Sequence, residues 1–173
     1  MAKIFSRTPR RARFESLCAT LRPDVYRFAY WLARDRSVAE DVVQETFMRA
    51  WRSIDSLATD GAAKAWLLTI ARREHARLYE RKRFETVDID ELSGLEGATP
   101  SAANADDLAE VRAAIFALDG DYREPLVLQV LFGYTTQEIA DVLGLTQGAV
   151  LTRLFRAREK LRATLLPPAE GES

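Results

Sequence analysis

Apolar residues recur at every third or fourth position along most of this 173-residue sequence, and the pattern is interrupted once. That spacing is typical of amphipathic helices. From about Phe84 to Ala103 the periodicity stops among glycines, a proline, and small and acidic residues. We therefore predict an all-α fold in which residues 1–83 and residues 105–173 form two small helical domains. Residues 84–104 are predicted to be a flexible acidic linker.

Composition excludes several classes of protein. The sequence has no run of 18 uncharged apolar residues that could span a membrane, and its basic N-terminus lacks the apolar core of a secretory signal. We therefore expect a cytoplasmic protein. The single cysteine, Cys18, cannot form an internal disulfide, and the single histidine, His75, cannot build a metal site alone. We interpret Cys18 as a buried structural thiol and His75 as a surface residue, and we predict no metal and no cofactor.

Charge is strongly segregated along the chain, although the formal net charge is only −1. Residues 64–83 carry seven basic and two acidic residues, whereas residues 84–124 carry two basic and eleven acidic ones. The basic residues that follow all lie between Arg153 and Arg162. Two basic helices on either side of an acidic segment suit a protein that contacts a polyanion at two places. Two solvated helix faces would explain the same pattern.

Three features of the first domain are interpreted as structural rather than functional. Pro23 is expected at the first position of a second helix, where its missing N–H costs nothing. The basic residues at the N-terminus are predicted to form a solvated tail rather than a specific contact: Lys3, Arg7, Arg10, Arg11 and Arg13. The tryptophans continue or border apolar stripes, which favours core packing over base stacking for Trp31, Trp51 and Trp66.

One predicted helix of the first domain has a distinctly polar and acidic face. Ser37 and Glu40 have the spacing of a capping box, which predicts that this helix begins at Val38. Its predicted buried stripe consists of Ala39, Val42, Val43, Phe47, Ala50 and Trp51. The residues outside that stripe include Asp41, Gln44 and Glu45. An acidic face is unsuited to DNA, so a protein partner is the more reasonable interpretation.

A further helical pattern, after a predicted loop from Asp55 to Gly61, carries a row of basic residues. Arg73, Arg77 and Arg81 are spaced four residues apart and therefore project from one face. Like charges aligned in this way repel by about 0.2–0.5 kcal/mol per pair. A phosphate partner would reverse the sign of that effect, so the row suits a nucleic-acid contact.

The segment from Thr135 to Arg162 has the pattern of a helix-turn-helix. Thr135 and Glu138 form a second capping-box pair at the start of a short helix. The turn and the helix crossing carry the small, capping or branched residues that they require: Ala140, Gly144, Thr146 and Val150. The second helix is suited to the major groove of DNA, although an ordinary helical hairpin explains the pattern too.

Three segments of this sequence, in this order, carry a shared pattern. They are SVAEDVVQETFMRAW at residues 37–51, AWLLTIAR at residues 65–72 and GYTTQEIADVLGLTQGAVLTRLFRAR at residues 133–158. Together they resemble the extracytoplasmic-function (ECF) sigma factors of bacterial RNA polymerase. The resemblance implies that residues 1–83 bind core polymerase and recognise and melt the minus-ten promoter element, while the helix-turn-helix in residues 105–173 recognises the minus-thirty-five element. It also implies an anti-sigma factor that hides these surfaces until a signal arrives.

The resemblance further implies roles for individual residues. Contacts with the clamp helices of the polymerase's largest subunit are implied for Asp41, Gln44 and Glu45. The loop from Asp55 to Lys64 would capture a flipped minus-ten base. Contacts with the DNA around the minus-ten element are implied for Lys64, Arg72, Arg73 and Arg77. Contacts with the minus-thirty-five duplex are implied for Gln147, Leu151, Thr152, Arg153 and Arg156.

The sequence departs from the usual pattern of these sigma factors at three positions. Family members usually carry an asparagine and then an acidic residue where this chain has Arg73 and Arg77. They often carry a lysine or another polar residue at the position of Leu151. The differences suggest an unusual minus-ten preference and an apolar contact of Leu151, for example with a thymine methyl, unless they are neutral.

Two other classes of function were weighed against a non-enzymatic sigma factor. A dimeric helix-turn-helix repressor or activator would bind palindromic half-sites about one helical turn apart, and it would leave the face of Asp41, Gln44 and Glu45 unexplained. The other class is a hydrolase or transferase that uses a pair of carboxylates. The sequence does not support it, because it contains no Gly-rich phosphate loop, no nucleophile context and no metal-spaced cluster. We therefore predict a sigma factor whose partners are core RNA polymerase, promoter DNA and an anti-sigma factor.

Overall fold

The computed structural model describes residues 7–85 and 105–166, with the side chains of residues 9–81 and 108–166. The described residues contain helices and no strand, so the all-α prediction is confirmed. They form two compact units, Met1–Gly94 and Leu95–Ser173. Of the predicted linker, residues 86–104 lie outside the described residues. None of the helices in the described ranges is both long and apolar enough to cross a bilayer.

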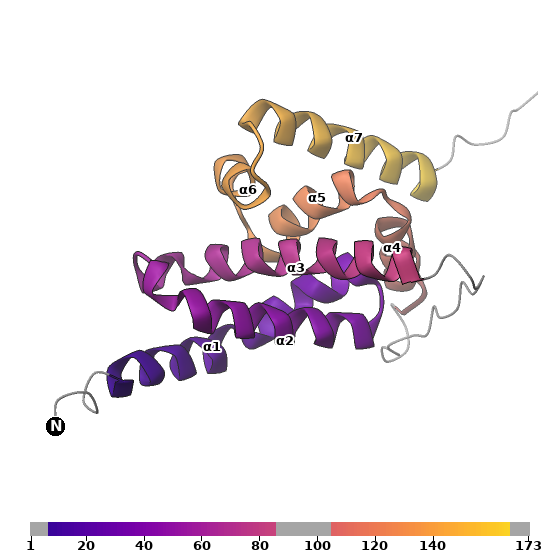
Figure 1. Cartoon of the computed structure of the whole chain (residues 1–173). Coiled ribbons are helices and arrows are strands. Elements are labelled where there is room, and N and C mark those ends of the chain that lie inside the picture. Colours follow the sequence, from indigo (N-terminus) through magenta and orange to yellow (C-terminus); the bar gives the residue numbers. More distant parts are fainter. Residues whose placement is uncertain (1–6, 86–104, 167–173) are drawn as a thin grey trace, which may run out of the picture. The chain divides into compact units, whose positions relative to one another are not determined.

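Three long helices build the first unit: α1 (Arg7–Ala33), α2 (Arg36–Ser53) and α3 (Ala63–Glu85). They pack against one another, each against the other two, as Figure 1 shows. The predicted loop between α2 and α3 is a pair of short 3₁₀ turns, η1 (Ile54–Ser56) and η2 (Asp60–Ala62). The core contains side chains from all three helices, among them Val25, Phe28, Leu32, Val42, Val43, Leu67, Leu68 and Ala71.

The prediction of a new helix at Pro23 is wrong, because α1 continues through this residue. A proline inside a helix lacks the N–H that would bond the carbonyl four residues earlier, here that of Ala19. Both Pro23 and Ala19 are exposed, so solvent can hydrate the unbonded carbonyl. The apolar stripe that continues beyond Pro23 packs on α2 and α3 and keeps the helix intact.

The start of α2 also differs from the prediction. Asp35, rather than Ser37, is the N-cap, and its Oδ1 accepts a hydrogen bond of 2.8 Å from the backbone N–H of Val38. The helix therefore begins at Arg36, two residues earlier than expected. Glu40 does not complete a capping box, because Ser37 lies inside the helix, and its carboxylate forms an ion pair of 3.0 Å with Arg22 of α1.

Two side-chain predictions in the first unit are wrong as well. Trp51 is not a core residue: 38% of it is exposed, and it lines a surface groove. Trp66, by contrast, packs against the core residues Ile54 and Leu57 as predicted, although it is only half-buried. The basic N-terminal residues are not merely a solvated tail, because α1 begins at Arg7, and both Arg10 and Arg13 form ion pairs with residues beyond α2. Lys3 lies outside the described residues.

The second unit consists of α4 (Ala105–Ala117), α5 (Gly120–Phe132), α6 (Thr136–Leu143) and α7 (Gln147–Leu165). α7 packs on the other three helices. α5 begins at Gly120 and runs through Pro125. Leu108 and Val111 are exposed, whereas Ala114, Phe116 and Leu118 are buried. Buried Arg123 donates to the carbonyl oxygens of Phe116 and Leu118, at 3.1 and 2.7 Å, and so satisfies the C-terminal end of α4.

Candidate functional site

The polar face predicted on α2 is exposed in the structure. Asp41, Gln44 and Glu45 all point to solvent, because Ala39, Val42 and Val43 turn the opposite face of the helix into the core. Thr46 is the exception to the polar-outside pattern. Its side chain is fully buried, and its hydroxyl donates to the carbonyl of Val42 at 2.6 Å.

Next to this face, α1 and α2 enclose a groove of about 500 Å³. Its lining is mainly aromatic and aliphatic, with polar side chains at its edge: Phe14, Arg22, Glu40, Gln44, Phe47, Met48 and Trp51. The Phe14 ring lies edge-on to Phe47 and Trp51, with centroid distances of 6.3 and 5.1 Å. An apolar groove beside exposed carboxylates has the anatomy of a protein-binding surface, with an apolar centre and a polar rim.

The basic residues predicted to contact DNA near the minus-ten element fall into different environments on α3. Arg73, Arg77 and Arg81 are exposed and form the predicted row. Arg72 is half-buried. Lys64, at the start of α3, is half-buried and forms an ion pair of 2.7 Å with Asp24 of α1. Among the α3 side chains that the structure describes, which end at Arg81, the three arginines of the row are therefore the most accessible basic groups.

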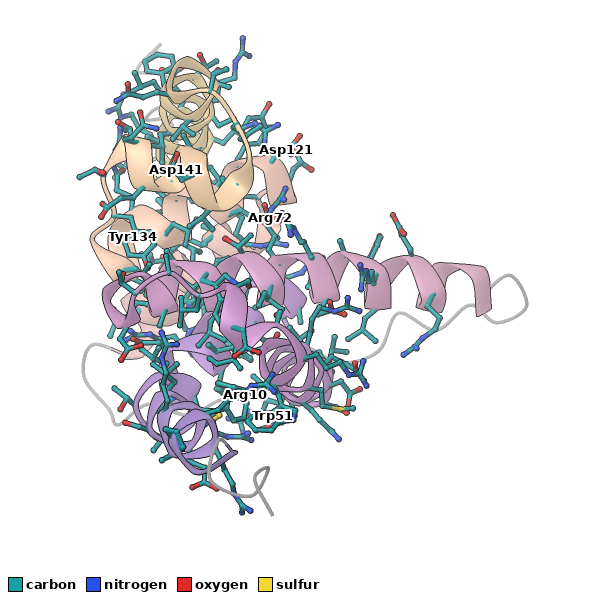
Figure 2. All side chains as sticks on the ribbon, turned by 60° about the vertical axis from the view of Figure 1, so that its left-hand side comes forward. Arg10, Trp51, Arg72, Asp121, Tyr134 and Asp141 are labelled. Carbon is teal, nitrogen blue, oxygen red and sulfur yellow. The ribbon has the colours of Figure 1, made fainter. Side chains whose placement is uncertain are left out.

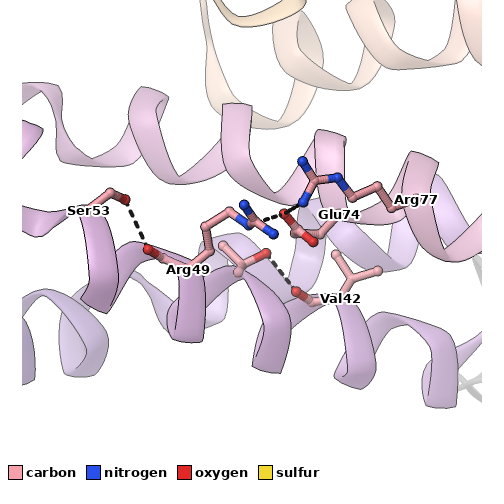
Figure 3. A network of polar contacts seen from close by, with 6 residues as sticks. Val42, Arg49, Ser53, Glu74 and Arg77 are labelled. Carbon is pink, nitrogen blue, oxygen red and sulfur yellow. Dashed lines mark hydrogen bonds and ion pairs between the residues drawn. The ribbon is translucent and has the colours of Figure 1, made fainter.

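A buried carboxylate lies beneath that row and connects α3 to α2. Oε1 of Glu74 is 2.6 Å from Nε of Arg49, on α2, and 3.2 Å from Nη1 of Arg77, as Figure 3 shows. The Glu74 side chain is only 5% exposed, so the two guanidinium groups compensate a charge that has lost its water. Glu74 thus contacts one guanidinium nitrogen of Arg77, while 55% of the Arg77 side chain remains exposed.

The helix-turn-helix has the predicted local geometry. Hydrogen bonds of 2.8 Å run from the backbone N–H and from the hydroxyl of Thr135 to Oε2 of Glu138. These two bonds, the backbone one first, lower the pKa of Glu138. Gly144 has a φ of 66°, and Thr146 caps α7 by accepting from the N–H of Ala149 at 3.2 Å. Together these features fix α6 and α7 as a tight pair.

The outer face of α7 carries four of the five residues predicted to contact the minus-thirty-five element. Gln147, Leu151, Thr152 and Arg156 are exposed, and Gln147 donates to the hydroxyl of Thr136 at 2.8 Å. The fifth residue, Arg153, lies at the edge of the buried stripe and forms an ion pair of 2.9 Å with Asp121 of α5. The structure therefore separates Arg153 from the other four.

Comparison with known proteins identifies the family. Residues 17–85 match the family of sigma-70 region 2, and residues 108–161 match that of sigma-70 region 4. ECF sigma factor EcfG of Rhodopseudomonas palustris is 34% identical over 144 residues, which cover 83% of this chain and 80% of that protein. SigL of Mycobacterium tuberculosis is 35% identical over 159 residues, which cover 90% and 88%. The chain belongs to the ECF RNA polymerase sigma factors.

Solved structures agree with that assignment. This sigma factor is similar to the sigma factor RpoE from Bartonella quintana, solved in complex with the anti-sigma factor NepR, with a TM-score of 0.74 and 29% identity over 88% of this chain and 96% of that one. It is also similar to CnrH, solved with the cytosolic domain of CnrY, with a TM-score of 0.65 and 30% identity over 90% and 88%. The predicted resemblance is therefore confirmed, and the chain is a transcription initiation factor.

Sequence reasoning missed several surface and buried residues of this sigma factor. Glu74 stands in register with the apolar residues Leu67, Ile70 and Leu78, and a lone carboxylate on such a stripe is the signal that could have revealed the buried network. Phe155 follows Leu151 by one helical turn, and these two side chains are 60% and 54% exposed. They give the outer side of α7 an unusual apolar patch.

The sigma factor's single cysteine, Cys18, and single histidine, His75, are both half-buried, where a buried thiol and a surface residue were predicted. Burial raises the pKa of the Cys18 thiol, with Arg22 acting in the opposite direction. The His75 ring is half-buried and lies 6.5 Å from the Tyr79 ring. Within residues 7–85 and 105–166, no three potential metal-ligating side chains gather at one place.

Proposed function

We propose that this sigma factor uses three separate surfaces, one for core polymerase and two for promoter DNA. The observation that carries this proposal is the charge division of the first unit: α2 presents the exposed Asp41 and Glu45, whereas α3 presents a row of exposed arginines. Two opposite charges on neighbouring helices suit two different partners, since only the basic helix attracts a phosphate backbone. We further propose that residues 1–83 act as the polymerase and minus-ten domain and residues 105–173 as the minus-thirty-five domain.

The polymerase surface consists of Asp41, Gln44 and Glu45 together with the neighbouring groove. Met48 and Trp51 supply the apolar area in that groove, and the carboxylates supply charge complementarity to a basic partner. This assignment also gives a reason for the exposure of Trp51, which costs the isolated chain part of its hydrophobic stabilisation. We assign no catalytic role to the chain, and we place its action in the cytoplasm, where its polymerase and template are.

The minus-ten surface consists of the segment from Asp55 to Lys64 and the arginines of α3. Arg73 and Arg77 are exposed, and Arg72 lies beside them on the same helix. The minus-thirty-five surface consists of Gln147, Leu151, Thr152 and Arg156. We assign Arg153 a structural role at the edge of this surface, because Asp121 holds its guanidinium group.

We also propose regulation by an anti-sigma factor. The similar proteins RpoE and CnrH were solved with NepR and with the cytosolic domain of CnrY, respectively. An inhibitor of this chain has to cover at least one of the proposed surfaces. The groove lined by Met48 and Trp51 offers the apolar area that such a partner needs.

The first test is multi-round transcription with sigma-free core polymerase on sheared DNA from the source bacterium, with and without the chain. The proposal expects new transcript starts that share two spaced upstream elements. Binding to DNA without binding to core polymerase, and without new starts, would instead support a dimeric repressor.

Two sets of variants test the assignment of the surfaces. Reversing the charge of both Asp41 and Glu45 to arginine is expected to weaken binding to core polymerase and to leave binding to a minus-thirty-five duplex unchanged. Arg156→Ala is expected to weaken duplex binding. It should also reduce the slope of the logarithm of affinity against the logarithm of salt concentration by about one, the effect of one lost phosphate contact. Arg162→Ala is the matched control, because it removes the same charge from the last turn of α7.

A further inference from the structure

Two arginines near the start of α1 reach the segment that joins α2 to α3. Nε and Nη2 of Arg13 both lie 2.7 Å from Oδ1 of Asp60. Nη2 of Arg13 also donates to the carbonyl of Leu57 at 3.4 Å. A single side chain of α1 therefore contacts both halves of the joining segment, more than 40 residues away in the sequence.

Arg10 makes a second set of contacts one turn earlier on α1. Its Nη2 donates to the carbonyl of Trp51 at 3.0 Å and lies 3.2 Å from Oδ2 of Asp55. Its guanidinium carbon stands 4.8 Å from the centre of the Trp51 ring, and Figure 2 shows these two side chains together. This geometry combines an ion pair with a cation–π contact. We call Arg10 and Arg13 the arginine clamp.

The segment held by the clamp has little regular structure of its own. It consists of two 3₁₀ turns, with backbone hydrogen bonds of 3.1 Å from Leu57 to Ile54 and from Ala62 to Thr59. On its inner side, buried Ile54 and Leu57 pack near α1, whereas its outer residues are exposed. Short turns of this kind open easily, so contacts with α1 decide how firmly the segment keeps its shape.

The clamp also changes the charge that the segment presents. Asp55 and Asp60 are exposed carboxylates within the segment assigned above to the minus-ten element. Unpaired, they would repel the phosphates of an approaching DNA strand. Each is paired with one arginine of α1, so the segment as a whole is close to neutral.

We propose that Arg10 and Arg13 are positioning residues for the minus-ten contact of this sigma factor. They hold the α2–α3 segment in the shape that receives the DNA strand, and they neutralise Asp55 and Asp60, without themselves touching the DNA. The inference rests on the proposed function of that segment. It adds the start of α1 to the parts of the chain on which promoter recognition depends.

Because these ion pairs are partly exposed, the effect of losing one arginine on DNA binding can be distinguished from its effect on the stability of the fold. Exposed pairs of this kind contribute little to overall stability. Loss of one arginine should therefore leave the fold intact while it loosens the segment. An effect on DNA binding without an equal effect on unfolding is the signature of a positioning residue.

The test measures binding of the holoenzyme to a labelled single-stranded oligonucleotide that carries the minus-ten element of a promoter mapped by transcription. Arg13→Ala is expected to weaken this binding by about three- to tenfold, because the segment then populates its binding shape less often and the unpaired Asp60 repels the DNA backbone. Arg13→Lys, which keeps the charge but loses the double contact, should recover part of the loss. Affinity for core polymerase and the denaturation midpoint should stay close to wild type in both variants.

The matched control is Arg11→Ala. Arg11 lies on the same helix and pairs with Glu15 of its own helix at 2.7 Å, so its removal changes the same charge without touching the segment. Oligonucleotide binding by Arg11→Ala should equal that of wild type. If Arg11→Ala and Arg13→Ala lost the same oligonucleotide affinity, the change in net charge would explain the effect, and the inference would be overturned.

A double variant separates an indirect role from a direct DNA contact. If Arg13 acts through Asp60, then adding Asp60→Ala to Arg13→Ala removes the uncompensated carboxylate and restores part of the binding. If Arg13 contacts the DNA itself, Arg13→Ala weakens binding as much in the Asp60→Ala background as in the wild-type chain, and the inference is wrong. Failure of the wild-type holoenzyme to bind the oligonucleotide would instead contradict the proposed function of the segment.

Discussion

The buried carboxylate of Glu74 offers the sharpest test of how the first unit is held together. We consider Glu74→Gln, which keeps the size of the side chain but removes its charge. The amide oxygen of glutamine can take the place of Oε1 and accept from both Arg49 and Arg77, but these bonds lose the assistance of the carboxylate charge, and an NH₂ group replaces Oε2 in the buried site. The substitution should therefore lower the free energy of unfolding.

The expected size follows from the exposure of the three side chains. Buried hydrogen bonds to charged groups contribute about 1.5–3 kcal/mol, whereas exposed ion pairs contribute about 0–1 kcal/mol. Glu74 is 5% exposed, but Arg49 and Arg77 are 46% and 55% exposed and keep much of their hydration after the loss. We therefore expect a cost of about 1–2 kcal/mol, between the two limits. With an m-value of about 2 kcal/mol/M in urea, the midpoint should fall by about 0.5–1 M.

Tryptophan fluorescence during urea denaturation is the suitable assay. The chain has three tryptophans, Trp31, Trp51 and Trp66, and all of them lie in the first unit. Their signal therefore reports the unfolding of that unit, even if the second unit unfolds separately. Glu80→Gln is the matched control, because Glu80 lies on the same helix with its side chain exposed.

The reasoning would be refuted if Glu74→Gln and Glu80→Gln had the same midpoint. A double-mutant cycle with Arg49→Gln adds a second check. Once Glu74 has lost its charge, removing Arg49 should cost less than it does in the wild-type chain. Additive losses would show that the ion pair between Arg49 and Glu74 contributes nothing to stability.

Three further predictions concern local signals in both units. Gly144→Ala should destabilise the second unit by about 1 kcal/mol through its backbone alone, since φ is 66° and no atom lies within 4 Å of the added Cβ. Thermal melting followed by circular dichroism should show this loss, while tryptophan fluorescence stays unchanged. Asp35→Ala should lower the fluorescence-detected stability by about 1 kcal/mol because α2 loses its cap, whereas Ser37→Ala should have little effect. The pKa of Glu138 is lowered, so its ionised form stabilises α6 above pH 4.5, and this contribution should disappear as the pH falls through the folded-state pKa. In Glu138→Gln that pH-dependent part of the melting curve should be missing.

The helix-turn-helix could be predicted in detail because its signals are local. A capping box, a turn glycine and an N-cap each act within four residues of sequence, and the structure has all three at Thr135, Gly144 and Thr146. The same kind of reasoning placed the cap of α2 two residues too late. Asp35 and Ser37 are both chemically able to cap, and in the structure Asp35 is the cap while Glu40 pairs with Arg22 of α1.

The remaining errors arose where distant parts of the chain meet. Pro23 was taken as a helix start because only its local preference is visible in sequence, whereas packing on α2 and α3 keeps α1 continuous. Trp51 was placed in the core by periodicity, although it sits at the edge of the stripe and stacks with Arg10. The contacts of Arg10 and Arg13 could not be predicted at all, because nothing local links the start of α1 to Asp55 and Asp60.

The proposed surfaces of the first unit are not structurally independent. Arg49 on α2 and Arg77 on α3 share one oxygen of Glu74, so an exposed arginine of the proposed DNA-binding row is tied to the helix that carries Asp41, Gln44 and Glu45. A change at Glu74 is therefore expected to disturb both surfaces at once. Transcription alone would confuse the two effects. Unfolding, polymerase binding and oligonucleotide binding have to be measured separately, because only their differences show whether Glu74 acts on α2, on α3 or on the connection between them.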